Sequence, residues 1–163
     1  MLSSTLALTA AAVTLLFADA PEFEAFRLRP NIEEPGRFTF VRVAYDSAGG
    51  YGEAYYKFEG RFWHRWETDY PEAERNLLYR IEELSTIRVN PQPIHLRLTD
   101  ETLTKYPFIY MCDVGWRYLS KEEAAALRTY LERGEFLWLD DFWGDGEWDN
   151  FAVQMARAYP RLK

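Results

Sequence analysis

Acidic side chains gather in one short stretch of the sequence, FLWLDDFWGDGEWDNF, which covers residues 136–151. Asp140 and Asp141 directly follow an apolar run, and three more acids stand among glycines and tryptophans. Carboxylates in such a pattern can bind a cation, hydrogen-bond a polyol or transfer protons, and Asp also favours helix starts. Because one helix cap uses one carboxylate, we expect one member of the 140/141 pair to bond backbone amides and the other to face a cleft.

The single cysteine, Cys112, excludes an intrachain disulfide and is the first candidate nucleophile. A nucleophile elbow needs small residues on both sides, whereas Cys112 lies between Met111 and Asp113. A neighbouring carboxylate raises the pKa of a thiol, which makes it less reactive. We therefore expect Cys112 to be structural.

The two histidines of the chain lie in different surroundings. His64 stands in RFWHRWETDYP, an aromatic-rich segment that could close over a cleft. His95 alternates with Ile94 and Leu96, as an ordinary strand residue does. The glycines of SAGGYG, residues 47–52, follow a strand but lack the G-x-G-x-x-G and Walker patterns of phosphate-binding loops. His64 is thus a candidate ligand contact, and no nucleotide site is predicted.

Four strands and three helices must position these residues. The spacing of apolar residues predicts strands at 38–45, 93–98, 106–112 and 136–140, the last two as nearly continuous apolar runs buried on both faces. The helices are expected after Pro71, after Ser120 and from Glu147. Capping boxes are predicted at Asp69 with Glu72 and at Ser120 with Glu123, and the helix that starts after Ser120 is expected to end at Gly134. Residues 46–66 are interpreted as a long, partly ordered loop.

This alternation indicates an α/β fold: a three-layer sandwich with a mostly parallel sheet, flavodoxin-like in outline. Parallel strands bring their carboxyl ends to one edge, where ligands bind near the point at which strand order reverses. The chain ends at the close of a helix, so either the sheet is small or the C-terminal part of the domain is missing. The residues expected to bind a ligand at this edge are Asp46, His64, Trp66, Asp140, Asp141 and Trp143.

Composition bounds the class of protein. The 163 residues suit one domain, and the 48% of hydrophobic and 17% of aromatic residues are typical of a globular protein. A net charge of −7 disfavours nonspecific binding to nucleic acid and to anionic lipid. We expect a 1–20 signal peptide, a 21–37 N-terminal extension and a 38–163 α/β domain.

The signal peptide is predicted from the apolar stretch of residues 6–17 and the small residues Ala18 and Ala20 around Asp19. The stretch lacks a basic start, and twelve apolar residues are too few to cross a bilayer. An uncleaved anchor and a buried N-terminal helix are the alternatives. The mature protein would be periplasmic or extracellular and would have no transmembrane span.

Several segments together resemble one bacterial family: FTFVRVAYDS, the pattern W.TDYP.A..NLL.R...LS.IRVN at 66–90, LSKEEAAALRTYLERGEFLWLDDF and EWDNF. The chain resembles the domain of unknown function 4159 family over roughly residues 38–160. The resemblance implies an exported or envelope-associated protein with a class I glutamine amidotransferase-like fold, similar to trimerisation-type domains of sugar-cleaving enzymes, and no established reaction. The amidotransferase G-x-C-x-G motif is absent around Cys112, no His-x-Glu pair follows, and family members are longer.

The sequence therefore predicts a noncatalytic ligand-binding or assembly module with an acidic and aromatic cleft, its ligand a carbohydrate or envelope component. No cofactor and no resident metal are expected. The alternative is a metal-dependent hydrolase acting on a sugar or envelope substrate, in which Asp140 and Asp141 hold a divalent ion and His64 handles protons. An interaction scaffold that forms homo-oligomers is the third reading.

Overall fold

Four strands form one sheet in which each neighbouring pair runs parallel, as the sequence predicts. The computed structural model describes residues 21–32, 34–47 and 55–160, so the predicted signal peptide lies outside the described residues. The strands are β1 (Val41–Val43), β4 (Ile94–Leu96), β5 (Phe108–Cys112) and β6 (Phe136–Asp140). Their order across the sheet is β4-β1-β5-β6, which makes β4 and β6 the two edges.

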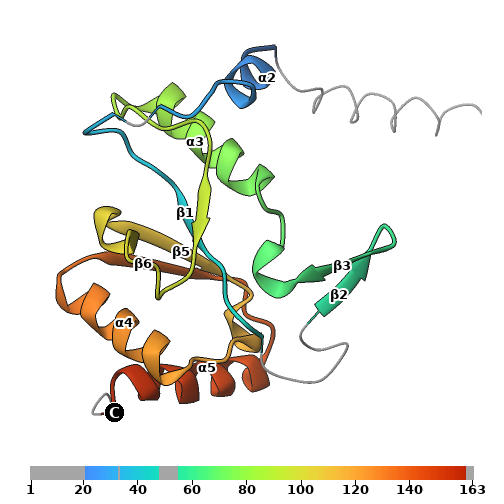
Figure 1. Ribbon diagram of the computed structural model, residues 1–163. Helices are drawn as coiled ribbons and strands as arrows, with labels where there is room; N and C mark the ends of the chain where they lie inside the picture. Colours follow the sequence, from blue (N-terminus) through green and yellow to red (C-terminus); the bar gives the residue numbers. More distant parts are fainter. Residues whose placement is uncertain (1–20, 33, 48–54, 161–163) are drawn as a thin grey trace, which may run out of the picture.

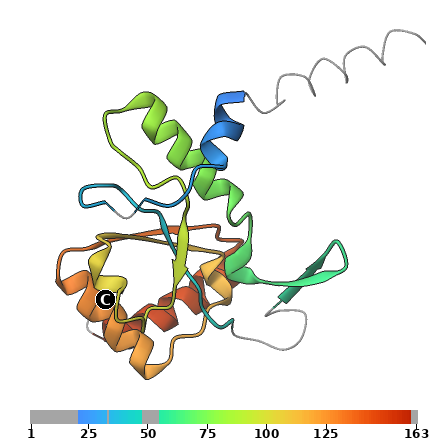
Figure 2. The ribbon, with the colours of Figure 1, turned by 45° about the horizontal axis from the view of Figure 1, so that its top comes forward.

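Helices cover both faces of this sheet and complete a mixed α/β architecture. Helix α3 (Glu72–Leu84) lies on one face, and α4 (Lys121–Glu132) and α5 (Asp145–Ala158) lie together on the other (Figure 1). The view in Figure 2 shows the same separation of α3 from the α4 and α5 pair. Within the described part of the chain, no helix is both long and apolar enough to cross a membrane.

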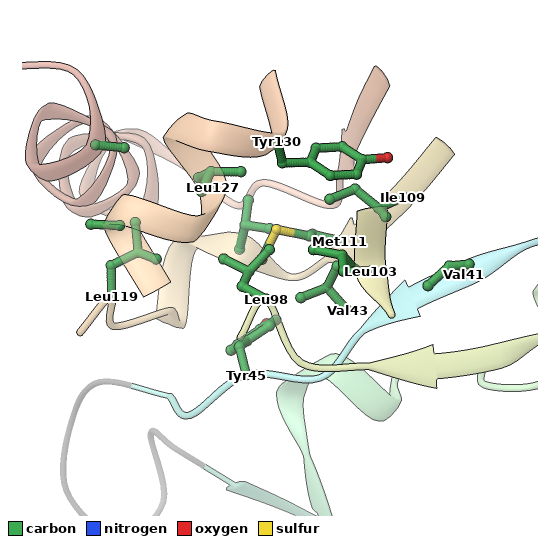
Figure 3. Close-up of a cluster of buried hydrophobic side chains, with 13 residues drawn as sticks. Val41, Val43, Tyr45, Leu98, Leu103, Ile109, Met111, Leu119, Leu127 and Tyr130 are labelled. Atoms are coloured by element: carbon green, nitrogen blue, oxygen red, sulfur yellow. The ribbon is translucent and has the colours of Figure 1, made fainter. Parts of the chain in front are cut away.

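Alternating side chains build a core on each side of the sheet. Ile109 and Met111 of β5 point toward α4, where Leu127 and Tyr130 lie over them (Figure 3). Tyr110 and Cys112, one residue out of phase, join the opposite cluster under α3. The period of two in a strand explains why one apolar run serves both clusters.

Helix α4 begins and ends as its sequence predicts. The Ser120 hydroxyl accepts a hydrogen bond from the Glu123 amide at 3.0 Å, and the Glu123 carboxylate accepts one from the Ser120 amide at 3.0 Å. Two amides that no helical carbonyl can reach are thereby satisfied. Gly134 follows the helix with a φ of 87°, a conformation that glycine adopts without a steric penalty.

Within the predicted N-terminal extension, residues 21–27 form the helix α2 (Pro21–Arg27). Phe26 is 0% exposed and packs edge-on against Tyr79 of α3 at 5.6 Å. The Arg27 guanidinium also pairs with Glu72 at 2.7 Å. This segment is therefore part of the folded body. The three prolines and mixed charge of residues 21–37 do not predict its short helix from the sequence.

The loop predicted at 46–66 is wrong in its second half, while residues 48–54 lie outside the described residues. Strands β2 (Tyr55–Phe58) and β3 (Arg61–His64) form an antiparallel hairpin apart from the main sheet (Figure 1). Its two turn residues, Glu59 and Gly60, have φ angles of 49° and 79°. Positive φ at both positions matches the twist of a tight hairpin turn.

Two further predictions are corrected. Asp69 does not cap α3: it has a φ of 57°, and Pro71 precedes the helix without a side-chain cap. Strand β6 is not buried on both faces, since it is an edge strand whose Phe136 and Trp138 are 60% and 42% exposed. The apolar run of β6 resembles that of β5, but β5 has a neighbouring strand on each side and β6 has one neighbour.

Candidate functional site

The order of the strands reverses between β1 and β5. From β1 the chain moves to β4 on one side, and from β5 it moves to β6 on the other. Ligands of open parallel sheets bind at the carboxyl ends beside such a reversal. Polar residues follow each strand there: Asp46 after β1, Arg97 after β4, Asp113 after β5 and Asp141 after β6.

The end of the hairpin lies over this edge. The 3₁₀ helix η1 (Arg65–Glu67) follows β3, and the Glu67 carboxylate accepts a hydrogen bond from the His64 amide at 2.8 Å. The Arg65 guanidinium forms an ion pair with Asp113 at 3.4 Å. Consecutive residues of one short segment therefore contact different parts of the edge.

One cavity lies at the carboxyl ends of β1 and β4, and we call it the histidine pocket. It has a volume of about 370 Å³ and is lined by Ala44, His64, Trp66, His95, Leu96, Arg97 and Asp100. The size falls within the range of about 300–1,000 Å³ usual for small-molecule sites. Both histidines of the chain are thus brought to one cavity.

Aromatic contacts hold the rings of the histidine pocket in place. The Trp66 ring lies 5.1 Å from the His95 ring and 6.3 Å from the His64 ring, nearly parallel to the latter. The Tyr70 hydroxyl is 3.3 Å from Nδ1 of His95, and the Tyr55 ring meets the edge of His64 at 4.8 Å. Each imidazole therefore packs against a neighbouring aromatic ring, which restricts its orientation.

Asp46 contributes to the histidine pocket through Arg97 and does not line it. Its two carboxylate oxygens accept hydrogen bonds from the Arg97 guanidinium at 2.8 and 3.2 Å. The hydrogen bonds from Arg97 lower the pKa of Asp46. Asp100 holds the backbone of Arg97, since its carboxylate accepts a 2.6 Å hydrogen bond from the Arg97 amide. Arg97 is therefore held by two carboxylates.

The other predicted ligand-binding residues, Asp140, Asp141 and Trp143, lie at the end of β6 and do not line the histidine pocket. Asp140 accepts hydrogen bonds from the Asp141 amide at 2.9 Å and from the Tyr110 hydroxyl at 3.2 Å. Asp140 is thus the member of the pair that bonds the backbone. The six residues expected to form one cleft are divided between the two sides of the edge.

Asp113 is a functional candidate that the sequence-based set omits. It follows β5 with a φ of 54°, and its buried Oδ1 atom accepts no hydrogen bond from the residues that the structure describes. Burial raises the pKa of Asp113 to about 6, the Arg65 guanidinium opposes that rise, and the carboxylates of Glu147 and Asp141 add to it. A carboxyl group with such a pKa can hold a proton near neutral pH.

Cys112 is buried beneath this edge, on the α3 side of the sheet. Burial raises the pKa of its thiol to about 11, and the Asp141 carboxylate, 3.9 Å from Sγ, adds to the rise. A thiol with this pKa is protonated at neutral pH and is a poor nucleophile. The geometry agrees with the structural role expected for Cys112.

The described residues contain no group of three or more His, Cys, Asp and Glu side chains arranged to hold a metal ion. Asp140 and Asp141 therefore have no third donor of this kind beside them among the residues described. The candidate residues that the sequence-based ligand-binding set leaves out are His95, Arg97, Asp100 and Asp113. Alternation along residues 93–98 already placed His95 and Arg97 on one face of a strand, which was the available signal.

Comparisons with known proteins give a family and no activity. A search of curated proteins returned no significant match. The model of one protein family, described as Domain of unknown function (DUF4159), matches residues 26–163, which include the whole sheet and the helices α3 to α5. The chain therefore belongs to the DUF4159 family.

Proposed function

We propose that this protein is a noncatalytic ligand-binding module that takes a polyhydroxylated ligand, such as an oligosaccharide, in the histidine pocket. The observation that carries the proposal is the convergence of both histidines on one cavity around Trp66. The cavity lies at the edge of the sheet where open parallel folds bind ligands. Its walls combine ring surfaces with a few oriented polar groups, which is typical of small-molecule sites.

The polar groups of the pocket suit hydroxyls better than a strongly charged ligand. Arg97 is already paired with Asp46, so neither side chain presents an uncompensated charge. An imidazole nitrogen can donate a hydrogen bond to a hydroxyl or accept one from it, and Nε2 of His95 is not used by the Tyr70 contact, which is made through Nδ1. The indole and Leu96 supply apolar surface for the CH groups of a sugar ring.

The chemistry of the pocket supports binding rather than catalysis. Among the described residues, its lining contains no Ser, Thr, Cys or Lys that a histidine could activate. Cys112 lies outside the lining and its thiol is protonated. The metal-dependent alternative gains no support from the described donors, because no group of three is gathered.

We extend the proposal to the finer fold and to the location of the protein. Taken in chain order as strands one to four, β1, β4, β5 and β6 lie as 2-1-3-4, the order of the first four strands in a flavodoxin-like sheet. This order supports a flavodoxin-like, amidotransferase-like sandwich. The apolar stretch at residues 6–17 supports export through a signal peptide.

Calorimetric titration with chito-oligosaccharides and cell-wall fragments tests the proposal. We expect saturable binding that H95A and R97Q each weaken at least tenfold, because both replace exposed polar groups of the pocket and spare the core. W143A is the matched control: its indole is 73% exposed at the end of β6, outside the pocket. An absence of saturable binding, or an equal loss in W143A, would remove the histidine pocket as the binding site.

A further inference from the structure

A second and larger cavity lies at the opposite end of the sheet from the histidine pocket. It has a volume of about 650 Å³, and its lining includes Arg37, Phe38, Asn90, Lys105 and Phe108. Phe38 precedes β1, and Lys105 precedes β5, so the cavity lies at the amino ends of the strands. We call it the amino-edge cavity. Its size is again within the range of about 300–1,000 Å³ for ligand sites.

Among the described residues that line this cavity, the two cations Arg37 and Lys105 outnumber the one acid, Glu34, although the chain as a whole is acidic. Arg37 and Arg88 share the single carboxylate of Glu34, at 3.0 and 4.0 Å. Lys105 lines the cavity and takes part in none of the ion pairs of the described residues. An ammonium group without a carboxylate partner is available to an anionic ligand.

An aromatic strip leads away from the cavity across the sheet. Phe38 and Phe108, both in the cavity wall, meet edge to face at 5.3 Å. Phe136 of the edge strand stacks on Phe108 at 5.9 Å, and Trp138 meets Phe108 at 6.3 Å. We call these four residues the aromatic strip. Helix α3 leaves Phe136 and Trp138 exposed, so the strip forms open apolar surface that continues the cavity wall.

We propose that the amino-edge cavity and the aromatic strip bind an amphipathic anion, a molecule with one acidic head group and a hydrocarbon tail. The head lies beside Lys105, and the tail runs over Phe108 toward Phe136 and Trp138. Covering exposed apolar surface is favourable in proportion to the area removed from water. The position of Lys105 in the cavity wall also sets the direction of the ligand, because the arginine nearest to Trp138 among the described residues, Arg42, is buried and paired with Glu74.

This proposal does not depend on the ligand of the histidine pocket. The two cavities lie at opposite ends of the strands and share no lining residue. Variants of one site should therefore leave the other unchanged.

Calorimetric titration of the full chain with dodecanoate at pH 8, below the concentration at which it forms micelles, tests the proposal. We expect saturable binding by the native chain and at least tenfold weaker binding by K105Q and by W138S. K121Q and V153S are the matched controls: Lys121 is exposed at the start of α4, and Val153 is 62% exposed on α5. Both controls should bind as the native chain does.

Dodecyltrimethylammonium supplies the same tail with the opposite charge and should not bind saturably. Equal binding of the cationic and anionic amphiphiles, or unchanged dodecanoate binding in K105Q, would overturn the proposal. Sedimentation equilibrium adds a second test: a dimer of the native chain that W138S abolishes would assign the aromatic strip to a second copy and also overturn it. Thermal melts of each variant establish that it is folded before it is titrated.

Discussion

Arg42 of β1 and Glu74 of α3 form an ion pair inside the fold, with side chains that are 1% and 0% exposed. Burial raises the pKa of Glu74, and the Arg42 guanidinium opposes that rise. The same guanidinium donates hydrogen bonds to the backbone carbonyls of Trp66 at 2.9 Å and Thr68 at 2.7 Å. One arginine therefore joins the sheet to α3 and to the segment that carries a wall of the histidine pocket.

Replacing Arg42 by Met should lower the free energy of unfolding by about 3–5 kcal/mol, because it leaves Glu74 buried without its partner. Urea denaturation measures the loss. The double variant R42M/E74L should recover most of it, since buried ion pairs can be replaced by packed apolar side chains. Ligand affinity in the histidine pocket should stay reduced in the double variant, because the carbonyls of Trp66 and Thr68 still lack their donor. Full recovery of affinity would contradict this role of Arg42.

The raised pKa of Asp113 predicts how stability depends on pH. In the unfolded chain this carboxyl ionises near its ordinary value of 3.8, whereas in the folded chain it keeps its proton to about pH 6. The folded state therefore binds more protons in this window, so stability falls as pH rises from about 4 to 6. The shift corresponds to a loss on the order of 2–3 kcal/mol at neutral pH.

D113N removes the ionisation of this carboxyl. Comparing D113N with the native chain therefore separates the contribution of Asp113 from that of other groups, such as Glu74, whose pKa is also raised. Urea unfolding at pH values from 4 to 8 should show the native chain losing stability relative to D113N across the window. Parallel stability curves for the two proteins would mean that Asp113 ionises normally in the folded state.

Gly115 in the 3₁₀ helix η3 (Val114–Trp116) packs directly against α5. A Cβ atom at this position would lie 2.2 Å from Cβ of Glu147, closer than two such atoms can approach. G115A should therefore destabilise the protein by about 1–3 kcal/mol through overpacking. G146A is the matched control, since no atom lies within 4 Å of its added methyl group. Differential scanning calorimetry should show a lower Tm for G115A alone, and equal values for both variants would contradict the contact.

Phe26 tests whether α2 belongs to the folded body. F26A empties a fully buried site between α2 and α3 and should cost about 3–5 kcal/mol. L28A changes a side chain of the same region that is 75% exposed and should stay within about 0.5 kcal/mol of the native chain. Chemical denaturation compares the two, and a similar small effect of both would mean that α2 is not part of the folded body.

Sequence reasoning identified the elements with strong local signals. The Ser120 and Glu123 spacing specified the start of α4, and alternation specified β4, because both signals depend on neighbours in the chain. The runs FIYMC and FLWLD look alike in sequence, yet one became a central strand and the other an edge. That difference depends on how many strands pair around each run, which no local pattern encodes.

The six residues expected to form one cleft do not share one cavity. Parallel pairing puts Asp46, Asp140 and Asp141 after the carboxyl ends of their strands, whereas His64 and Trp66 reach the same edge through the hairpin and η1. Which of these residues share a cavity depends on where the hairpin runs. Because residues 46–66 are interpreted as a loop, the path of the hairpin over the edge could not be predicted. Strand alternation accounts for His95 as an ordinary strand residue and therefore gives no sign of a site. Trp66, which lies 29 positions earlier in the chain, packs beside the His95 ring only in the folded protein.

His64 is both the last residue of β3 and part of the wall of the histidine pocket. Among the described strands, the hairpin pairs only with itself. A rotation of the hairpin relative to the sheet would therefore move the imidazole of His64 and change the shape of the pocket. If ligand binding and hairpin rotation are coupled, each must change the equilibrium of the other by the same factor, as thermodynamic reciprocity requires.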